Sequence, residues 1–207
     1  MDYHRSEALR YLRAKADDEA TGVLVDTVYL KMRNEVQARH IVQKHKCMVD
    51  KDGVTLDCGV RFSSKGLARH LEGCEECLLF AATLGMRVDA AIRRLSLLSV
   101  AEGAAAQAVG AALIESYCDE VQAKLEVGEL YQRPRYSPGY GDWALEEQKL
   151  LFSVLDCAKA IGLTLTDGCM MAPSKSVTAV IGLGKDTKCV LNKCMTCSKA
   201  DCEYREK

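Results

Sequence analysis

The sequence has almost no net charge and no long apolar run, and each shortage excludes a class of protein. Its 28 basic and 29 acidic residues give a formal net charge of -1, so nothing predicts a surface for nucleic acid or another polyanion. No apolar run approaches the length that spans a bilayer, so we expect no membrane segment. The first residues lack the apolar core of an export signal, and we therefore expect a cytoplasmic protein.

Several catalytic signatures are also missing. The residues show no internal repeat, no low-complexity segment and no credible nucleophile–histidine–acid triad. Gly182-Leu183-Gly184 lacks the following helix that a dinucleotide-binding fingerprint needs. His40 and His45 lie five apart on a predicted helix and would not share a face. We interpret the histidines as surface or core residues and not as metal ligands.

The composition is that of a globular protein with many thiols. Hydrophobic residues make up 48% of the 207 positions and charged residues 28%, which fits one sizeable core with a small appendage. We expect one domain over residues 1–186 and a cysteine-rich tail over 187–207. The cysteines number 11, an odd count without an export signal, so reduced thiols or metal ligands are favoured over disulfides.

The pattern of apolar residues predicts an α+β fold, with helices packed around an antiparallel sheet. Helices are expected over Ser6–Lys15, from Asp26 to about Lys46, from Ser63 or Ser64 to Leu71, and from Asp142 to about Ala160. The stretch Met86–Val127 predicts one broken helix or two adjacent helices. Strands are expected over Val54–Val60, over the apolar run Cys77–Leu84, and in the run ending at Gly182. The segment from Gly128 to Asp142 is the longest irregular one, and long loops in compact domains are often functional.

Within that segment, residues 135–140 read Arg-Tyr-Ser-Pro-Gly-Tyr. Pro138 fixes its own φ and Gly139 permits a positive φ, so the turn is predicted to hold one shape. Arg135 offers a planar fork suited to a carboxylate or a phosphate, and Tyr140 adds an aromatic face and a hydroxyl. This combination is typical of a site for a small zwitterionic ligand, although a plain surface turn with a solvated arginine would read the same way.

The downstream residues carry a family resemblance. Arg135-x-x-x-Gly139-Tyr140 is followed by a predicted helix, by Leu165-Thr166-Asp167 and by Met171-x-Pro173-x-x-Ser176-Val177-Thr178. At this spacing, residues 130–185 closely resemble the reactivation domain of cobalamin-dependent methionine synthase. A weaker resemblance extends upstream through Phe62-Ser63-Ser64 and residues 70–74 to residues 80–85.

The resemblance implies an S-adenosylmethionine-binding reactivation subunit, in which one electron and a methyl group restore an oxidised cobalamin on a partner protein. Arg135 would pair with the carboxylate of the ligand. Ser137, Gly139 and Tyr140 would form the wall around its adenosine part, and Glu115 is the candidate for the acidic contact of the family. The tyrosine that often follows the Ser-Val-(Ser/Thr) strand in the family is missing, and the Lys188-Cys189 region stands in its place.

The chain carries no corrinoid, homocysteine or folate domain, so the resemblance implies action in trans on a corrinoid-binding methionine synthase protein. Its electron donor is not identified. Two other functions are compatible with the sequence. One is a zinc-stabilised, non-catalytic assembly partner, and the other is a reductive activator of a different corrinoid methyltransferase.

The tail contains Cys189, Cys194, Cys197 and Cys202, four thiols within fourteen residues. Their spacing, Cys-x4-Cys-x2-Cys-x4-Cys, suits either an iron–sulfur cluster or zinc. Lysines among them would favour thiolates, and a cluster would offer an entry point for the reactivating electron.

The other cysteines are expected to be structural. Cys74-x-x-Cys77 has two carboxylates between its thiols, which disfavour thiolates, so we predict burial and leave a ligand or redox role as the alternative. The remaining five are expected to be small core residues: Cys47, Cys58, Cys118, Cys157 and Cys169.

Overall fold

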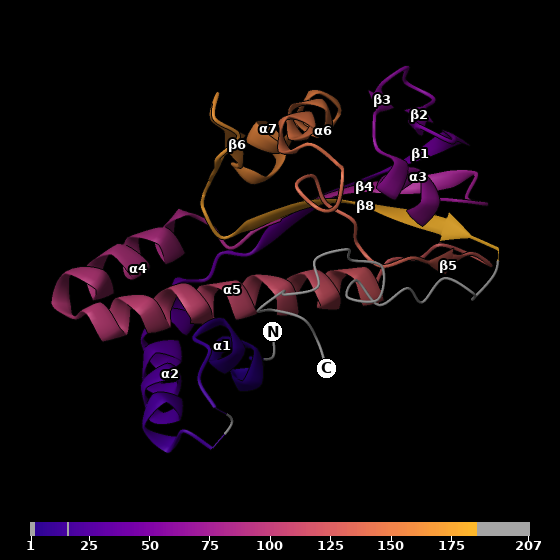
Figure 1. Ribbon diagram of the computed structural model, residues 1–207. Helices are drawn as coiled ribbons and strands as arrows, with labels where there is room; N and C mark the ends of the chain where they lie inside the picture. The colour runs from indigo at the N-terminus through magenta and orange to yellow at the C-terminus, as the bar shows by residue number, and fades with distance from the viewer. Residues whose placement is uncertain (1–2, 16, 186–207) are drawn as a thin grey trace.

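The computed structural model describes residues 3–15 and 17–185 (Figure 1). The helices are α1 Arg5–Tyr11, α2 Glu19–Met32, η1 Arg33–Glu35, α3 Lys65–His70, α4 Met86–Leu98, α5 Val100–Ala123, η2 Leu145–Glu147, α6 Gln148–Val154 and α7 Cys157–Ile161. The strands are β1 Arg39–Asp50, β2 Gly53–Leu56, β3 Arg61–Phe62, β4 Glu76–Thr83, β5 Tyr131–Gln132, β6 Thr164–Leu165, β7 Met171–Ala172 and β8 Ser176–Gly184. None of the helices in these ranges is long and apolar enough to cross a membrane.

One antiparallel sheet organises the fold, with the strand order β3-β2-β1-β4-β8-β5. Strands β6 and β7 form a separate pair. The predicted α+β class, helices around an antiparallel sheet, is confirmed. Seven of the eight residues of β4 are buried, because this strand is central and both of its faces are covered by helices.

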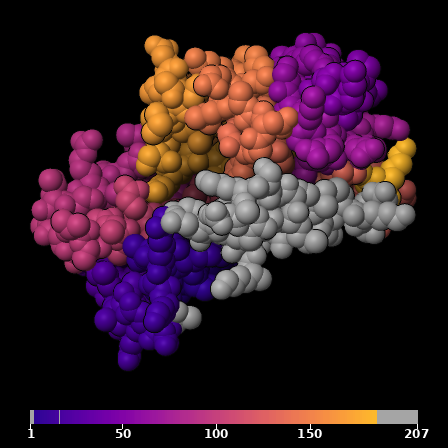
Figure 2. Space-filling model, viewed as in Figure 1, coloured from indigo at the N-terminus to yellow at the C-terminus, as the bar shows by residue number. Residues whose placement is uncertain are grey.

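The helices form a layer on each side of the sheet (Figure 1). On one face, α4 and α5 cover the sheet, and α1 and α2 pack against α5 from outside. On the other face lie α3, α6 and α7. Alternate residues of β4 enter different cores: Phe80 packs with the α4–α5 side and Leu79 with the α6–α7 side, as the two-residue period of a strand requires. Figure 2 shows the orange segment after α5 between the purple hairpin of β1 to β3 and the yellow-orange residues that lead into β8.

The prediction of a helix from Asp26 to about Lys46 is wrong about both the first and the last residue of that helix. Helix α2 begins earlier, because the side chain of Asp18 accepts a hydrogen bond from the backbone N–H of Thr21 at 3.0 Å. The helix ends at Met32, and the residues from Arg39 onward form β1. Strand β1 pairs with β4 along eight residues, so hydrogen bonding to a central buried strand overrides the weak helical spacing of these residues.

The other predicted elements are mostly confirmed. Cys77–Leu84 lies in or next to β4, Met86–Val127 forms α4 and α5, and Ser64 caps α3 through its Oγ. The strand predicted over Val54–Val60 ends at Leu56, because a turn follows. The helix predicted from Asp142 to Ala160 is broken before α7, whose cap is the side chain of Asp156.

Gly182 in β8 provides a test of this packing. A Cβ atom at this position would lie 2.5 Å from Leu71 Cδ2 and 3.0 Å from Cys74 Sγ. We expect Gly182→Ala to lower the free energy of unfolding by about 1–3 kcal/mol, because overpacking forces buried neighbours apart. Chemical denaturation of the variant measures this loss. The matched control is Gly168→Ala, where a Cβ would meet no atom within 4 Å. Equal losses in the two variants would contradict the packing described here.

Candidate functional site

The segment after β5 runs beside β8 and is fixed to it by backbone hydrogen bonds. The N–H of Arg133 donates to the carbonyl of Gly182 at 2.8 Å. Further on, Tyr136 and Val180 exchange two bonds, at 2.9 Å and 2.8 Å. Arg135 lies between these two attachment points. Its backbone position is therefore set by the central sheet, although the segment is formally a loop.

Arg133 fastens the same segment to the end of α3. Its Nη1 donates to the carbonyl of His70 and its Nη2 to the carbonyl of Glu72, both at 2.6 Å. Nε2 of His70 lies 2.8 Å from the carbonyl oxygen of Pro134. Arg133 is buried, and its guanidinium donates to backbone carbonyls. We therefore assign it a structural role.

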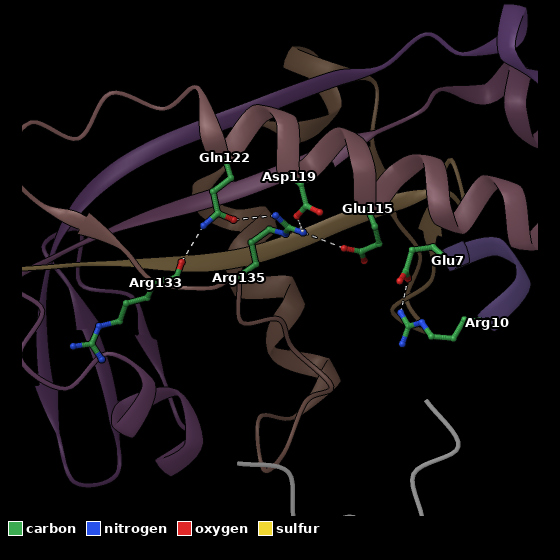
Figure 3. A network of polar contacts seen from close by, with 7 residues as sticks. All are labelled: Glu7, Arg10, Glu115, Asp119, Gln122, Arg133 and Arg135. Carbon is green, nitrogen blue, oxygen red and sulfur yellow. Dashed lines mark hydrogen bonds and ion pairs between the residues drawn. The ribbon is translucent and has the colours of Figure 1, made fainter. Parts of the chain in front are cut away.

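Arg135 points to the opposite side and meets helix α5 (Figure 3). Its Nη2 donates to Asp119 Oδ1 at 2.7 Å and to Glu115 Oε2 at 3.0 Å. Its Nη1 donates to Gln122 Oε1 at 2.9 Å, and the amide of Gln122 in turn donates to the carbonyl of Arg133 at 3.0 Å. The expected alternative of a solvated surface arginine does not apply, because only 7% of the Arg135 side chain is exposed.

The charge of this buried guanidinium is balanced by its neighbours. Burial alone would lower the pKa of Arg135, but Cys118 and the carboxylates of Asp119 and Glu115 outweigh burial and raise it. The two carboxylates face outward: the side chain of Glu115 is 35% exposed and that of Asp119 is 69% exposed. The solvent-facing side of the guanidinium is therefore the side on which these two acids lie.

Helix α1 borders the same network. Glu7 and Arg10 form an ion pair beside Glu115 (Figure 3). Burial, together with the charge of Glu115, raises the pKa of Tyr11 to about 12. Partial burial and the charge of Glu115 likewise raise the pKa of Tyr140. A tyrosine hydroxyl is protonated at neutral pH even at its ordinary pKa, so both hydroxyls can donate hydrogen bonds.

The turn after Arg135 has the shape that its sequence predicts. Gly139 has φ +90°, which favours glycine, and its N–H donates to the carbonyl of Trp143 at 2.8 Å. The N–H of Tyr140 donates to the carbonyl of Ser137 at 3.2 Å. Tyr140 is 53% exposed. The turn therefore presents an aromatic face to solvent near the guanidinium network.

Three aromatic rings, those of Tyr136, Trp143 and Phe62, pack in succession beside the turn. Tyr136 stacks on Trp143 with ring centroids 6.0 Å apart, and Trp143 meets Phe62 edge-on at 5.3 Å. Trp143 is 1% exposed, and its Nε1 donates to Glu147 Oε2 at 2.8 Å. Because the indole is buried and its N–H is paired, Trp143 holds a fixed position and stabilises the turn at Gly139 that bonds to its carbonyl.

Asp142 ties the turn to α3. Its carboxylate accepts hydrogen bonds from the hydroxyl of Ser64 and from the backbone N–H groups of Lys65 and Gly66, each at 2.8 Å. These two N–H groups belong to the first turn of the helix, where no intrahelical acceptor exists. One side chain thus satisfies the start of α3 and fixes the end of the loop.

The structure brings together most of the residues that the sequence singled out. Arg135, Ser137, Gly139 and Tyr140 share one turn, and the candidate Glu115 contacts Arg135 directly. The sequence analysis missed Asp119 and Gln122. Their spacing from Glu115, four and seven residues, places all three on one helical face and would have revealed them.

The predicted thiol sites have different outcomes. Cys189, Cys194, Cys197 and Cys202 lie outside the described residues, so the iron–sulfur cluster or zinc there stays a prediction. The predicted burial of Cys74 and Cys77 is confirmed, at 5% and 0% exposure.

The remaining cysteines follow the prediction with one exception. Cys47, Cys118, Cys157 and Cys169 are buried as expected, but Cys58 is exposed, because it lies in the turn after β2. A hydrogen bond with Cys47, together with burial, raises the pKa of Cys77. This favours a thiol over a reactive thiolate at Cys77.

Comparisons with known proteins agree with this fold. Residues 105–203 match the family model described as "Vitamin B12 dependent methionine synthase, activation domain". No curated protein matches the chain significantly. Among solved structures, the chain is similar to the MetH reactivation domain bound to AdoHcy, with TM-score 0.63 and 16% identity over 86% of this chain and 70% of that one. The fold is thus that of a methionine synthase activation domain. The sequence resemblance to the reactivation domain of cobalamin-dependent methionine synthase is confirmed.

Asp142 provides a test of how the loop is fixed. Partial burial would raise its pKa, but hydrogen bonds from Ser64, Gly66 and Lys65 outweigh burial and hold the pKa below its usual value. Asp142→Ala is expected to lower the free energy of unfolding by about 1–2 kcal/mol near neutral pH, because a helix start loses its acceptor. A depressed pKa gives stability that is present above the unfolded pKa and lost as pH falls through the folded one.

Urea denaturation of parent and variant near neutral pH and at about pH 3 measures both effects. The difference between the two proteins should shrink at the lower pH. Asp167→Ala is the control, since Asp167 is an exposed loop residue. A difference that is unchanged at low pH would contradict the role assigned to the carboxylate.

Proposed function

We propose that the chain binds S-adenosylmethionine at the Arg135 turn and serves as a separate reactivation subunit for a cobalamin-dependent methionine synthase in the cytoplasm. The observation that carries this proposal is the buried, charge-balanced Arg135 next to the exposed Tyr140. This pair lies in the stretch of sequence that matches the activation-domain family. The similar solved structure, the MetH reactivation domain, is bound to AdoHcy, which supports a ligand of this class here.

The residues around Arg135 fit the amino-acid end of such a ligand. Both hydrogens of Nη2 are taken by Asp119 and Glu115, so a carboxylate must replace one of them to form a two-pronged pair. Asp119 is the more exposed of the two acids, and its contact with Arg135 is the less costly one to exchange. Glu115 then remains beside the bound carboxylate and can accept the ammonium group of the ligand.

The turn fits the adenosine end. Tyr140 offers an exposed ring for stacking and a protonated hydroxyl for hydrogen bonding. Gly139 has no side chain to hold the ligand away from the backbone, and Ser137 adds a hydroxyl on the same turn. Because the turn is fixed to β8 and to α3, these groups are positioned before the ligand arrives.

S-adenosylmethionine, when bound, supplies the methyl group for reactivation of the corrinoid of a partner protein. The residues of this chain bind and orient the donor. Arg135 and Glu115 fix the methionine end, and the fixed turn keeps the methyl-bearing sulfur in one position. Such positioning is a large part of the rate that a protein can contribute to a group transfer. The reducing electron comes from a separate donor, for which the tail cysteines are a candidate entry point.

A second candidate function keeps the fold without the ligand, as an assembly partner or as an activator of another corrinoid methyltransferase. The missing tyrosine near Lys188 is the observation in its favour. Calorimetric titration with S-adenosylmethionine separates the two, because an assembly partner would show no saturable binding.

Arg135→Ala is expected to weaken S-adenosylmethionine binding by about 1.5–3 kcal/mol, or roughly 10- to 150-fold in Kd, since a hydrogen-bonded charge pair is lost. Arg135→Lys should restore only part of the affinity, because an ammonium cannot form the planar fork. Isothermal titration calorimetry measures each Kd, and circular dichroism confirms that the variants are folded.

Arg87→Ala is the control for Arg135→Ala. Arg87 forms an exposed ion pair with Glu35 on the α4 side of the protein, and its removal should leave the Kd unchanged. Parental affinity in Arg135→Ala would refute the assignment of Arg135 to the ligand.

Gly139→Val tests the turn. The new side chain is strained at φ +90° and points toward Leu145, whose Cδ1 lies 3.5 Å from the Cβ position. We expect affinity for S-adenosylmethionine to fall at least about tenfold, because the strained turn moves the groups that line the site.

The matched control is Gly128→Val. Gly128 also has a positive φ, +67°, and open space around its Cβ position, but it lies outside the turn. Its substitution should cost stability and spare binding. If both variants bind as the parent does, Gly139 has no role in the site.

A further inference from the structure

The hairpin of β1 and β2 carries three potential metal ligands away from the Arg135 turn. One ligand atom each from His45, Asp57 and Cys58 lies within 4.8 Å of the other two. His45 is on β1, and the other two residues immediately follow β2. A nitrogen, a carboxylate oxygen and a thiol sulfur are the three donor types that proteins use for zinc.

The backbone holds the carboxylate in place. The N–H of Asp57 donates to the carbonyl of Lys46 at 3.0 Å, which extends the β1–β2 pairing by one residue. In return, the N–H of Lys46 donates to Asp57 Oδ2 at 3.1 Å. Gly59 has φ +86° and donates to the carbonyl of Leu56 at 2.9 Å, so the chain turns sharply at Cys58. This turn keeps the thiol close to the carboxylate.

His45 faces the same point. Its Nδ1 lies 2.7 Å from Asp57 Oδ1, and only 14% of its side chain is exposed. Its other nitrogen, Nε2, is buried and has no hydrogen-bond partner among the residues that the structure describes. The ring of His45 and the carboxylate of Asp57 therefore already lie side by side.

We propose that His45, Asp57 and Cys58 form a binding site for Zn²⁺. The metal would take the ring nitrogen of His45 that faces Asp57, one carboxylate oxygen of Asp57 and the thiolate of Cys58, with water in the fourth position. Three protein ligands and one open position are an established zinc arrangement. Asp57 Oδ2 keeps its bond from the N–H of Lys46, and this contact orients the ligand from outside.

The donor set selects the class of metal. Mg²⁺ and Ca²⁺ prefer oxygen ligands alone, whereas a thiolate and an imidazole favour zinc. Typical zinc bonds of about 2.0–2.3 Å place neighbouring ligand atoms of a tetrahedral site roughly 3.3–3.8 Å apart. The exposed side chains of Asp57 and Cys58 can reach this spacing by small rotations. The metal takes Cys58 as its thiolate, so binding releases the thiol proton and weakens as pH falls. Neutral His45 keeps its one ring proton, which moves from Nδ1 to Nε2 when Nδ1 binds the metal.

The test uses the full chain with the four tail cysteines replaced by serine, so that the tail cannot bind the metal. Co²⁺ is the probe, because it occupies zinc sites and a thiolate ligand gives it a charge-transfer absorption. We expect one Co²⁺ per chain with this absorption, and its displacement by ZnCl2 at the same stoichiometry. Cys58→Ser should abolish the absorption. His45→Ala and Asp57→Asn should each weaken binding at least about tenfold.

Two matched controls lie on the same hairpin. His40→Ala removes an exposed histidine of β1 that contacts Tyr117, and Asp52→Asn removes an exposed carboxylate from the turn. Both should leave the affinity and the absorption unchanged. The proposal is overturned if the tail-substituted chain shows no thiolate–cobalt absorption. It is also overturned if Cys58→Ser keeps the absorption, which would place the metal at the buried cysteines. Parental affinity in His45→Ala would also overturn it, because His45 would then not be a ligand and would only hydrogen-bond to Asp57.

Discussion

A buried guanidinium is stable only where other charges and acceptors replace the water that it has lost, and Arg135 depends on α5 for this. Its three side-chain partners lie on one face of that helix, at Glu115, Asp119 and Gln122. These three contacts therefore fix the position of the Arg135 segment along the axis of α5. Removing the helix face would leave a buried cation unpaired, and removing the cation would leave two carboxylates one helical turn apart. The two elements hold each other in register.

Strand β8 provides the second constraint. It pairs with β4 on one side and with β5 and Tyr136 on the other. The family-like motif that ends at Thr178 forms the entry to this strand, where the hydroxyl of Ser176 donates to the carbonyl of Pro173 at 2.8 Å. That motif lies far from the Arg135 turn in sequence, yet it builds the strand on which the turn rests. The second motif therefore supports the backbone of the first.

The sequence predicted the fold where a single strong signal decides the local structure. The continuous apolar run of β4, the Ser64 cap and the Pro138-Gly139 turn are cases of this kind. The prediction from sequence was wrong for β1, which was expected to be helical. This long strand lies between β2 and β4, and its hydrogen bonds to them determine its conformation. A mixed apolar pattern cannot reveal such partners.

The same reason explains what was missed in the candidate site. Arg135 was singled out from the residues of its own turn, but its hydrogen-bond partners lie 13 to 20 positions earlier, on a helix. Their spacing was readable, and only the fold shows that the helix face meets the turn. His45 was likewise placed on a helix, which hid its neighbours Asp57 and Cys58, because only a hairpin brings these three residues together.

The three aromatic rings beside the turn have an optical consequence. Trp143 is the one tryptophan of the sequence, and it is shielded from water and stacked on Tyr136. Its carbonyl receives the N–H of Gly139, so the chromophore is joined directly to the turn. The tryptophan fluorescence of this protein therefore comes from one place, next to its candidate ligand site. Selective excitation of Trp143 thus offers a probe of that turn without a label.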